Sequence, residues 1–236
     1  PPTLQEIRLE LHSPDYTARK AEIISGAARL IAGSRLDVDV VVDRPLERVE
    51  LVFENGQGQF REFLQPGPGR THFSLDPATS QPWVVKETGI YWFELVGDVT
   101  ARSRSWRLDA IPDKPPTAVI ENPPHGQAFW TRAVVPIIAD IRDDIRIRDI
   151  HLRVRLQAAG EQPDQRILIE KGPEHAMATD AISFEEFFSG DHRRILFAWD
   201  LGLEEGMEAG GVVEFELVVT DYQGNNSSSN VRHLRL

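Results

Sequence analysis

The segment Leu36–Val42 reads LDVDVVV, and it decides the fold class because apolar residues recur in it at every second position. A period of two places successive side chains on opposite faces of a β-strand. The same alternation returns in VELVF (49–53), IHLRVRL (150–156) and VEFELVV (213–219). Many short strands at this spacing, with no long helical segments between them, predict an all-β protein made of sandwiches.

A proline-rich segment divides the chain. Residues 111–117 read IPDKPPT, and the triplet Pro-Pro-Thr also stands at residues 1–3. Prolines remove backbone donors and favour extended geometry, so such a segment suits a short, stiff linker. The repeat spacing of 114 residues fits a sandwich of about 100 residues. We therefore predict two tandem sandwiches, residues 1–113 and 114–236, with a longer polar insertion around 157–193 in the second.

Composition excludes several classes of function. The chain has 236 residues, 41% of them hydrophobic, and a net charge of −11. This charge would repel a phosphate backbone, so nucleic acid is not an expected partner. The absence of cysteine excludes disulfides, thiolate metal sites and cysteine nucleophiles. No apolar run is long enough to span a bilayer, so we expect any membrane anchor or signal peptide of a parent protein to lie outside this segment.

One motif in the first half points to a family. The segment ETGIYWF (87–93) resembles the acidic-x-Gly-x-Tyr-x-Cys signature that leads into strand F of immunoglobulin-like domains, with Phe93 at the cysteine position. The resemblance implies that Tyr91 forms a tyrosine corner, with its ring packed inward and its hydroxyl bonded to nearby backbone. It also implies an immunoglobulin-like topology for the sandwich.

The second half lacks this tyrosine but shows related segments. TDYQGNNS (220–227) resembles the F–G turn of bacterial immunoglobulin-like and cadherin-like repeats, ADIRDDI (139–145) resembles their B–C region, and WDLGLEEG (199–206) resembles the entry to their penultimate strand. Together the two halves resemble tandem repeats of large membrane-anchored bacterial proteins, most of them uncharacterised. The resemblance implies an extracytoplasmic location, periplasmic or at the cell surface, and supplies no catalytic residue.

A group of acidic residues is the candidate metal site. Asp140, Asp143 and Asp144 stand at the end of a predicted strand, and Asp221 could approach from the F–G turn of the same domain. Calcium takes six to eight oxygen ligands, so four carboxylates with backbone and water could hold it. Calcium is the only cofactor that the sequence suggests.

Two simpler interpretations compete with calcium. Asp143 and Asp144 could cap a turn through bonds to the backbone. Alternatively, nearby arginines could neutralise the group as surface ion pairs; these are Arg142, Arg146 and Arg148.

Trp92 is the candidate ligand-binding residue. If Tyr91 and Phe93 face the core, strand parity turns Trp92 outward. An exposed indole can stack on a sugar or anchor a protein partner. The alternative is that Trp92 lies under a neighbouring loop or against the linker.

No constellation typical of catalysis emerges from the residues. The seven histidines include no pair with zincin spacing, and there is no Gly-x-Ser-x-Gly elbow. Asp191 and His192, in the polar insertion, are candidates for proton transfer only if the fold brings partners to them. We therefore expect a non-catalytic structural or interaction module of a bacterial cell-envelope protein. The alternative is a carbohydrate-binding accessory module of an extracellular enzyme.

Overall fold

The computed structural model describes residues 1–75, 82–156, 164–177 and 189–236. These residues form β-strands joined by turns and by short 3-10 helices, which confirms the all-β prediction; the 3-10 helices are η1 (Asp15–Thr17), η2 (Pro68–Arg70) and η3 (Leu201–Leu203). Within the described ranges, no helix has the length and apolarity that a membrane crossing requires.

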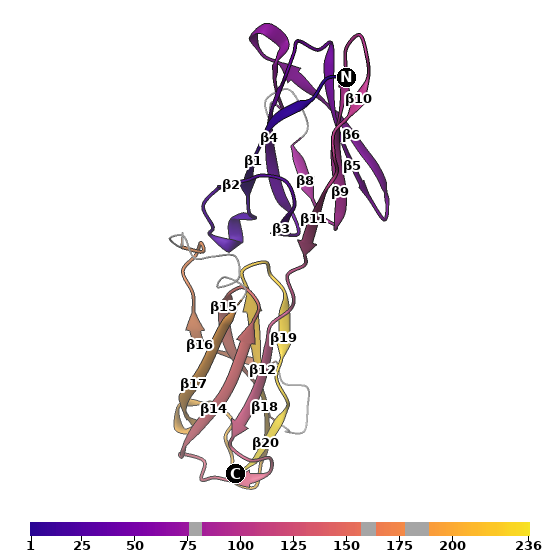
Figure 1. The fold of residues 1–236 in the computed structure, drawn as a ribbon. Helices are drawn as coiled ribbons and strands as arrows, with labels where there is room; N and C mark the ends of the chain where they lie inside the picture. Colours follow the sequence, from indigo (N-terminus) through magenta and orange to yellow (C-terminus); the bar gives the residue numbers. More distant parts are fainter. Residues whose placement is uncertain (76–81, 157–163, 178–188) are drawn as a thin grey trace. The chain divides into compact units, whose positions relative to one another are not determined.

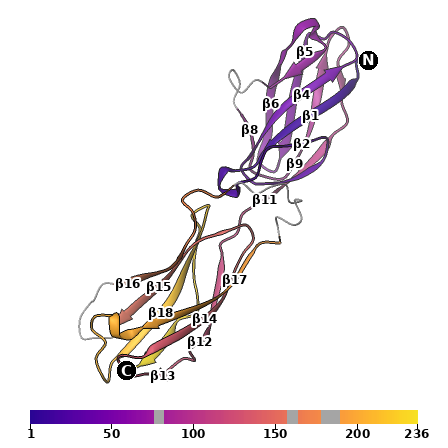
Figure 2. The same ribbon diagram turned by 90° about the vertical axis from the view of Figure 1, so that its left-hand side faces the viewer.

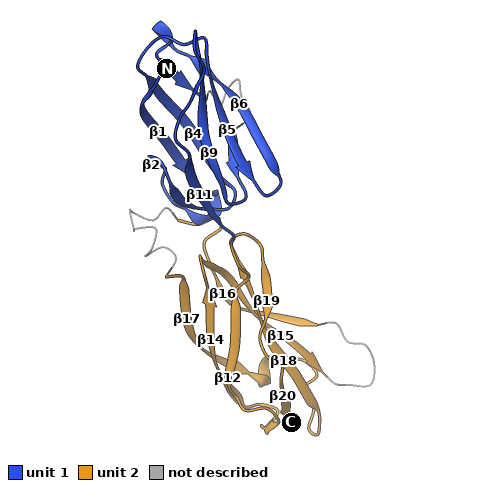
Figure 3. Ribbon diagram, turned by 45° about the vertical axis from the view of Figure 1, so that its right-hand side comes forward, with its two compact units in different colours: residues 1–112, 178–181 blue, residues 113–177, 182–236 orange. Residues whose placement is uncertain are grey.

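The chain separates into two compact units (Figure 3). The described residues of Pro1–Pro112 form unit 1, and those from Asp113 to the C-terminus form unit 2. The division falls after Pro112, so Asp113 of the proline-rich segment belongs to unit 2. Each unit has its own hydrophobic core.

Unit 1 is a single hydrogen-bonded sheet that encloses its core (Figure 1). Its strand order is β2-β1-β4-β7-β6-β5-β9-β11-β3, with β8 on β4 and β10 on β9. Strand β7 links the two layers because it pairs with both β4 and β6. The strands are β1 (Leu4–His12), β2 (Glu22–Ile24), β3 (Ala28–Ile31), β4 (Ser34–Val42), β5 (Arg48–Asn55), β6 (Gly58–Pro66), β7 (His72–Ser74), β8 (Trp83–Val85), β9 (Gly89–Val96), β10 (Ala101–Arg102) and β11 (Trp106–Ile111).

The alternation in Leu36–Val42 is the alternation of burial along β4. Every second residue from Ser34 to Val42 is buried, and the residues between are half-buried. The apolar positions of this strand enter the core of unit 1. Burying such side chains contributes about 25 cal/mol for each Å² of apolar surface removed from water, which is why this pattern fixes the face that the strand turns inward.

Tyr91 is fully buried, as the resemblance implied, and its hydroxyl has a distant partner. The hydroxyl donates to the backbone carbonyl of Gly26, 2.9 Å away and 65 residues earlier in the chain. Trp106 stacks on the phenol ring with centroids 5.3 Å apart. Gly26 has a φ of +80°, and a Cβ there would lie 2.8 Å from the Trp106 ring. Glycine is therefore required at the point where this loop meets the two rings.

Unit 2 is a sandwich of two separate sheets, which Figure 2 shows as two layers. One sheet has the order β12-β14-β17, and the other has the order β13-β20-β18-β15-β16 with β19 on β18. The strands are β12 (Thr117–Asn122), β13 (Gln127–Ala128), β14 (Val134–Asp143), β15 (Ile147–Leu156), β16 (Gln165–Lys171), β17 (Asp191–Asp200), β18 (Val212–Asp221), β19 (Asn226–Ser228) and β20 (Arg232–Arg235).

The side chain of Asn230 makes two hydrogen bonds to the backbone of β12, the first strand of unit 2. Its Oδ1 accepts from the backbone N–H of Ile120 at 2.7 Å, and its Nδ2 donates to the carbonyl of Ile120 at 3.3 Å. Arg232 donates to the same carbonyl at 2.7 Å. Both backbone groups of Ile120 are thereby satisfied by residues at least 110 positions later.

The predicted insertion around 157–193 contains regular structure. Its described part includes β16, which extends the sheet by pairing with β15, and the start of β17, which pairs with β14. Residues 157–163 and 178–188 of the predicted insertion lie outside the described residues.

Replacing Tyr91 by phenylalanine should lower the free energy of unfolding of unit 1 by about 1 to 3 kcal/mol, because the buried Gly26 carbonyl loses its donor. Chemical denaturation of the full chain measures this. Tyr222→Phe is the matched control, since the Tyr222 hydroxyl donates to the Pro173 carbonyl at an exposed position where water can replace it. Equal losses in the two variants would contradict the role assigned to Tyr91.

Candidate metal centre in unit 2

Two strands of unit 2, one from each sheet, end their core-facing rows in aspartate. On β14 the buried positions run from Val135 at every second residue to Asp143. On β18 they run from Val213 in the same way to Asp221. The carboxyl groups are therefore carried into the end of the sandwich by the parity that buries the apolar side chains. Asp143 is 7% exposed and Asp221 is 1% exposed.

Two more carboxyl groups lie beside this pair. Asp144 follows Asp143 in the turn between β14 and β15, and Asp113 lies in the proline-rich segment that precedes β12. One carboxylate oxygen from each of Asp113, Asp143 and Asp144 lies within 4.8 Å of the other two. The backbone N–H of Lys114 donates to Asp144 Oδ1 at 3.2 Å, which holds the proline-rich segment against the turn.

The hydrogen-bond donors are distributed unevenly over the four carboxylates. Asp221 accepts from the backbone N–H groups of Gly224 and Asn225 and from the Asn225 side chain, at 2.7 to 2.8 Å. Asp143 accepts at Oδ2 from the backbone N–H of Ile145 at 3.0 Å. The Oδ1 atoms of Asp113 and Asp143 are buried and have no hydrogen-bond partner.

This arrangement disfavours ionisation of two of the groups. Burial, followed by the hydrogen bond to Asp144 and the charges of Asp221, Asp144 and Asp143, raises the pKa of Asp113 to about 8. Burial also raises the pKa of Asp143 to about 6, against the opposing effect of the Ile145 N–H. Raised carboxyl pKa values of this kind mark a place where negative charge lacks compensation.

The neighbouring arginines do not supply that compensation. Arg142 pairs with Asp140 at 2.8 Å, Arg148 pairs with Asp149 at 2.8 Å, and Arg146 donates to the carbonyl of Met177 at 3.1 Å. Across the described ranges, no ion pair joins a lysine or arginine to any of the four carboxylates. Neutralisation by arginine, one of the two simpler interpretations, therefore holds for Asp140, which pairs with Arg142, and not for the four clustered carboxylates.

The turn-capping interpretation holds for one oxygen only. Asp143 caps the turn through Oδ2, which accepts from the Ile145 N–H, and its Oδ1 has no hydrogen-bond partner.

The set of clustered residues differs from the predicted set at two positions. Asp140 lies apart from the cluster, because it has the opposite parity on β14 and its carboxylate bonds to Arg142 and to His192 on β17. The bond from His192, and then that from Arg142, lowers the pKa of Asp140. Asp113 was not predicted, because only the three-dimensional path of the proline-rich segment brings it to the turn. Its position directly before Lys114-Pro115-Pro116 was the one available signal.

Trp92 points away from the core of unit 1, as strand parity predicted, but it is covered by a neighbouring segment, as in the alternative to an exposed ligand-binding indole. The side chain does leave the core side of β9, but it is 3% exposed because the guanidinium of Arg102 covers its ring at 3.8 Å. The exposed tryptophan of the structure is Trp130, at 88% exposure, which the sequence pattern did not single out. It lies just beyond β13, where no alternation exists from which to judge its direction.

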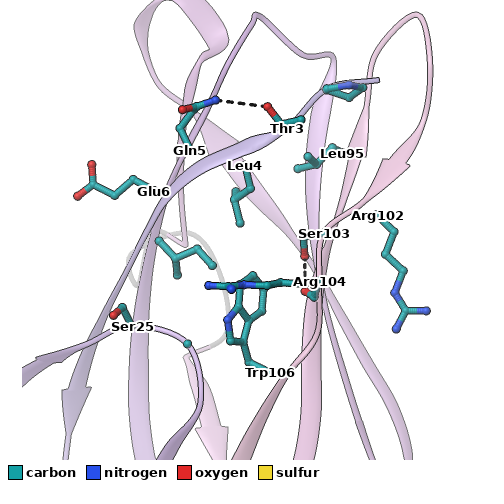
Figure 4. A pocket seen from close by; sticks show the side chains of 13 residues that line it. Thr3, Leu4, Gln5, Glu6, Ser25, Leu95, Arg102, Ser103, Arg104 and Trp106 are labelled. Atoms are coloured by element: carbon teal, nitrogen blue, oxygen red, sulfur yellow. Dashed lines mark hydrogen bonds between the residues drawn. The ribbon is translucent and has the colours of Figure 1, made fainter.

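Unit 1 has a cavity of about 460 Å³ between β1 and the segment that joins β10 to β11. Figure 4 shows Arg104 and Trp106 reaching into this space from one side and Leu4 from the other. The guanidinium of Arg104 lies 5.1 Å from the indole centroid, and Trp106 is 8% exposed. Three charged side chains, those of Glu6, Arg102 and Arg104, are among the residues that line the cavity.

Asp191 and His192, the candidates for proton transfer, bond to other residues instead of to each other. His192 bonds to Asp140 on the outer face of its sheet, and Asp191 pairs with Arg193 and accepts from the backbone N–H of Ile147 at 3.1 Å.

Comparison with known proteins finds distant likenesses among solved structures and no match among sequences. No family model and no curated protein matches the sequence. The fibronectin(III)-like modules of CbhA from Clostridium thermocellum are 13% identical, with a TM-score of 0.29 over 96% of this chain and 91% of theirs. DIP-gamma IG1+IG2 is 7% identical, with a TM-score of 0.29 over 100% and 96%. A cycloalternan-degrading enzyme from Trueperella pyogenes is 12% identical, with a TM-score of 0.30 over 86% of this chain and 33% of that one.

In a chelating buffer, the stability of unit 2 should fall as the pH rises from about 4 to about 8. Asp113 and Asp143 have folded-state pKa values of about 8 and about 6, above the usual value of about 3.9, so the folded state binds more protons across this window and is destabilised as they are released. Asp113→Asn should flatten this slope in urea denaturation. Asp140→Asn should leave it unchanged, and a slope that Asp113→Asn does not alter would contradict the assignment.

Proposed function

We propose that this chain is a non-catalytic structural or interaction module, a tandem pair of immunoglobulin-like sandwiches in a larger extracytoplasmic protein of a bacterial cell envelope. The observation that carries the proposal is the pair of separate cores. The core of unit 1 is built from residues between Leu9 and Leu108, and the core of unit 2 from residues between Ala118 and Leu234. Each can fold around its own apolar residues, as expected of modules strung along a chain.

The polar surface supports a non-catalytic function. On the outer face of β15, Arg153 pairs with Glu216, and Arg155 pairs with Asp164 and Glu214. These ion pairs neutralise the charges of Arg153 and Arg155 locally, within the surface of the sheet. The fold by itself assigns no activity.

Residues 1–112 and 113–236, produced separately, should each fold and unfold cooperatively at the midpoint of the corresponding transition in the full chain. Calorimetry measures the three samples. Failure of either half to fold alone would contradict the modular proposal, because it would mean that one core depends on the other unit.

A second candidate function, carbohydrate binding, now depends on Trp130 instead of Trp92. An indole exposed to 88% presents a flat apolar face of the kind that stacks on sugar rings. Arg132 and the short helix η3 lie beside the same segment, since Gly202 of η3 packs against Arg132.

Screening the full chain against cell-wall and plant polysaccharides tests this candidate. Binding that Trp130→Ala abolishes and Trp92→Phe preserves would favour the carbohydrate-binding function over the purely structural one. Absence of binding to every glycan would remove it.

A further inference from the structure

We infer that unit 2 binds one calcium ion, held by Asp113 from the proline-rich segment and by Asp143 and Asp144 from the β14–β15 turn. This inference is independent of the proposed structural function, because the site lies within unit 2 and either can fail without the other. The three residues place one carboxylate oxygen each within 4.8 Å of the others, a separation that a single cation can bridge.

A buried oxygen without a donor shows that the cluster is built for a ligand. Asp143 is 93% buried, since 7% of it is exposed, and its Oδ1 has no hydrogen-bond partner. Asp113 Oδ1 is also buried without a partner. Leaving a buried acceptor unsatisfied costs about 1 to 3 kcal/mol, and more for a charged group, so a bound cation would stabilise two such atoms in one cluster. No lysine or arginine provides it within the described ranges.

The ligand set selects among cations. The group contains only carboxylates, with neither histidine nor cysteine, which favours a hard ion such as calcium or magnesium over zinc or copper. Magnesium keeps most of its water and usually takes one or two carboxylates, whereas calcium accommodates several carboxylates in flexible geometry. Three carboxylates from two separate segments of chain therefore fit calcium better.

Asp221 would support the site by its charge, without binding the metal ion directly. Its carboxylate accepts three hydrogen bonds from donors of the β18–β19 turn, and its charge acts on both Asp113 and Asp143. It thus adds to the negative potential at the site without needing a direct bond to the metal. Of the four residues predicted from sequence, Asp143 and Asp144 are direct ligands, Asp221 is a supporting charge and Asp140 has no part.

The ion would also tie the proline-rich segment to the body of unit 2. Without it, this segment is held to the turn by the bond from the Lys114 N–H to Asp144 and by the hydrogen bond between the Asp113 and Asp144 side chains. A cation shared between Asp113 and the turn replaces carboxylate repulsion by attraction at the same point. Calcium should therefore order residues 113–116 as well as stabilise the sandwich.

The experiment is titration of the chelator-treated full chain with calcium chloride, followed by isothermal calorimetry and by thermal unfolding. We expect one site per chain with a dissociation constant of about millimolar or tighter. Calcium at about one hundred times that constant should raise the unfolding midpoint of unit 2 by several degrees and leave that of unit 1 unchanged.

Two neutralising variants separate metal binding from a simple folding defect. Asp113→Asn and Asp143→Asn should each weaken calcium binding by about tenfold or more. In chelator at neutral pH both should be at least as stable as the unaltered chain, because each removes an uncompensated buried carboxylate. Asparagine retains an acceptor for the Ile145 N–H, and Asp113 lies before the first strand, so both variants can fold.

Asp140→Asn is the matched control, since it removes an aspartate of the same segment that bonds to Arg142 and His192 instead. Calcium binding should be unchanged in it. The inference is overturned if calcium at about 10 mM gives neither heat nor a shift of the midpoint. It is also overturned if Asp140→Asn loses as much affinity as Asp143→Asn, or if magnesium binds as tightly as calcium.

Discussion

Four aspartates, Asp113, Asp143, Asp144 and Asp221, gather at the end of unit 2 where β14 and β18 end, and the hydrogen-bond donors there do not reach all of their oxygens. The surrounding turns and the proline-rich segment are arranged around this concentration of negative charge. Alternation along β14 and β18 carries Asp143 and Asp221 inward at the points where the core ends. Burial there is a consequence of the same parity that buries valine and isoleucine, so neither side chain can turn to solvent without moving its strand. The turn after β18 gives the Asp221 carboxylate three hydrogen-bond donors, whereas Asp143 Oδ1 has no hydrogen-bond partner.

The fold follows from the sequence because its signal is local and repeated. Alternation in LDVDVVV and in the matching segments of unit 2 determines which faces are buried, and it depends on no distant partner. The site is predictable in part for the same reason: Asp143 and Asp144 adjoin a strand whose parity can be read. Asp140 lies three positions before Asp143 on β14, so its side chain is on the opposite face of the strand. The prediction grouped the two residues because they are close in sequence.

The remaining features depend on contacts between segments far apart in the chain. The position of Asp113 beside the β14–β15 turn comes from the path of the proline-rich segment, which alternation does not describe. Arg102 covers Trp92 because β10 pairs with β9, and a strand of two residues leaves no periodic signal. The partner of Tyr91 is likewise set by a loop 65 residues earlier. In each case the outcome is decided by packing between loops, where side-chain chemistry matters more than pattern.

The bonds between Asn230 and Ile120 have a consequence for the order in which unit 2 is made. A ribosome releases β12 first, and β14 can pair with it soon afterwards. The backbone N–H and carbonyl of Ile120 nevertheless lack their Asn230 partner until 110 further residues have been synthesised. Because domains generally fold as units, the first strand of unit 2 gains these bonds only when the last part of the unit is present. Until then one edge of the nascent sheet remains open to water or to a chaperone.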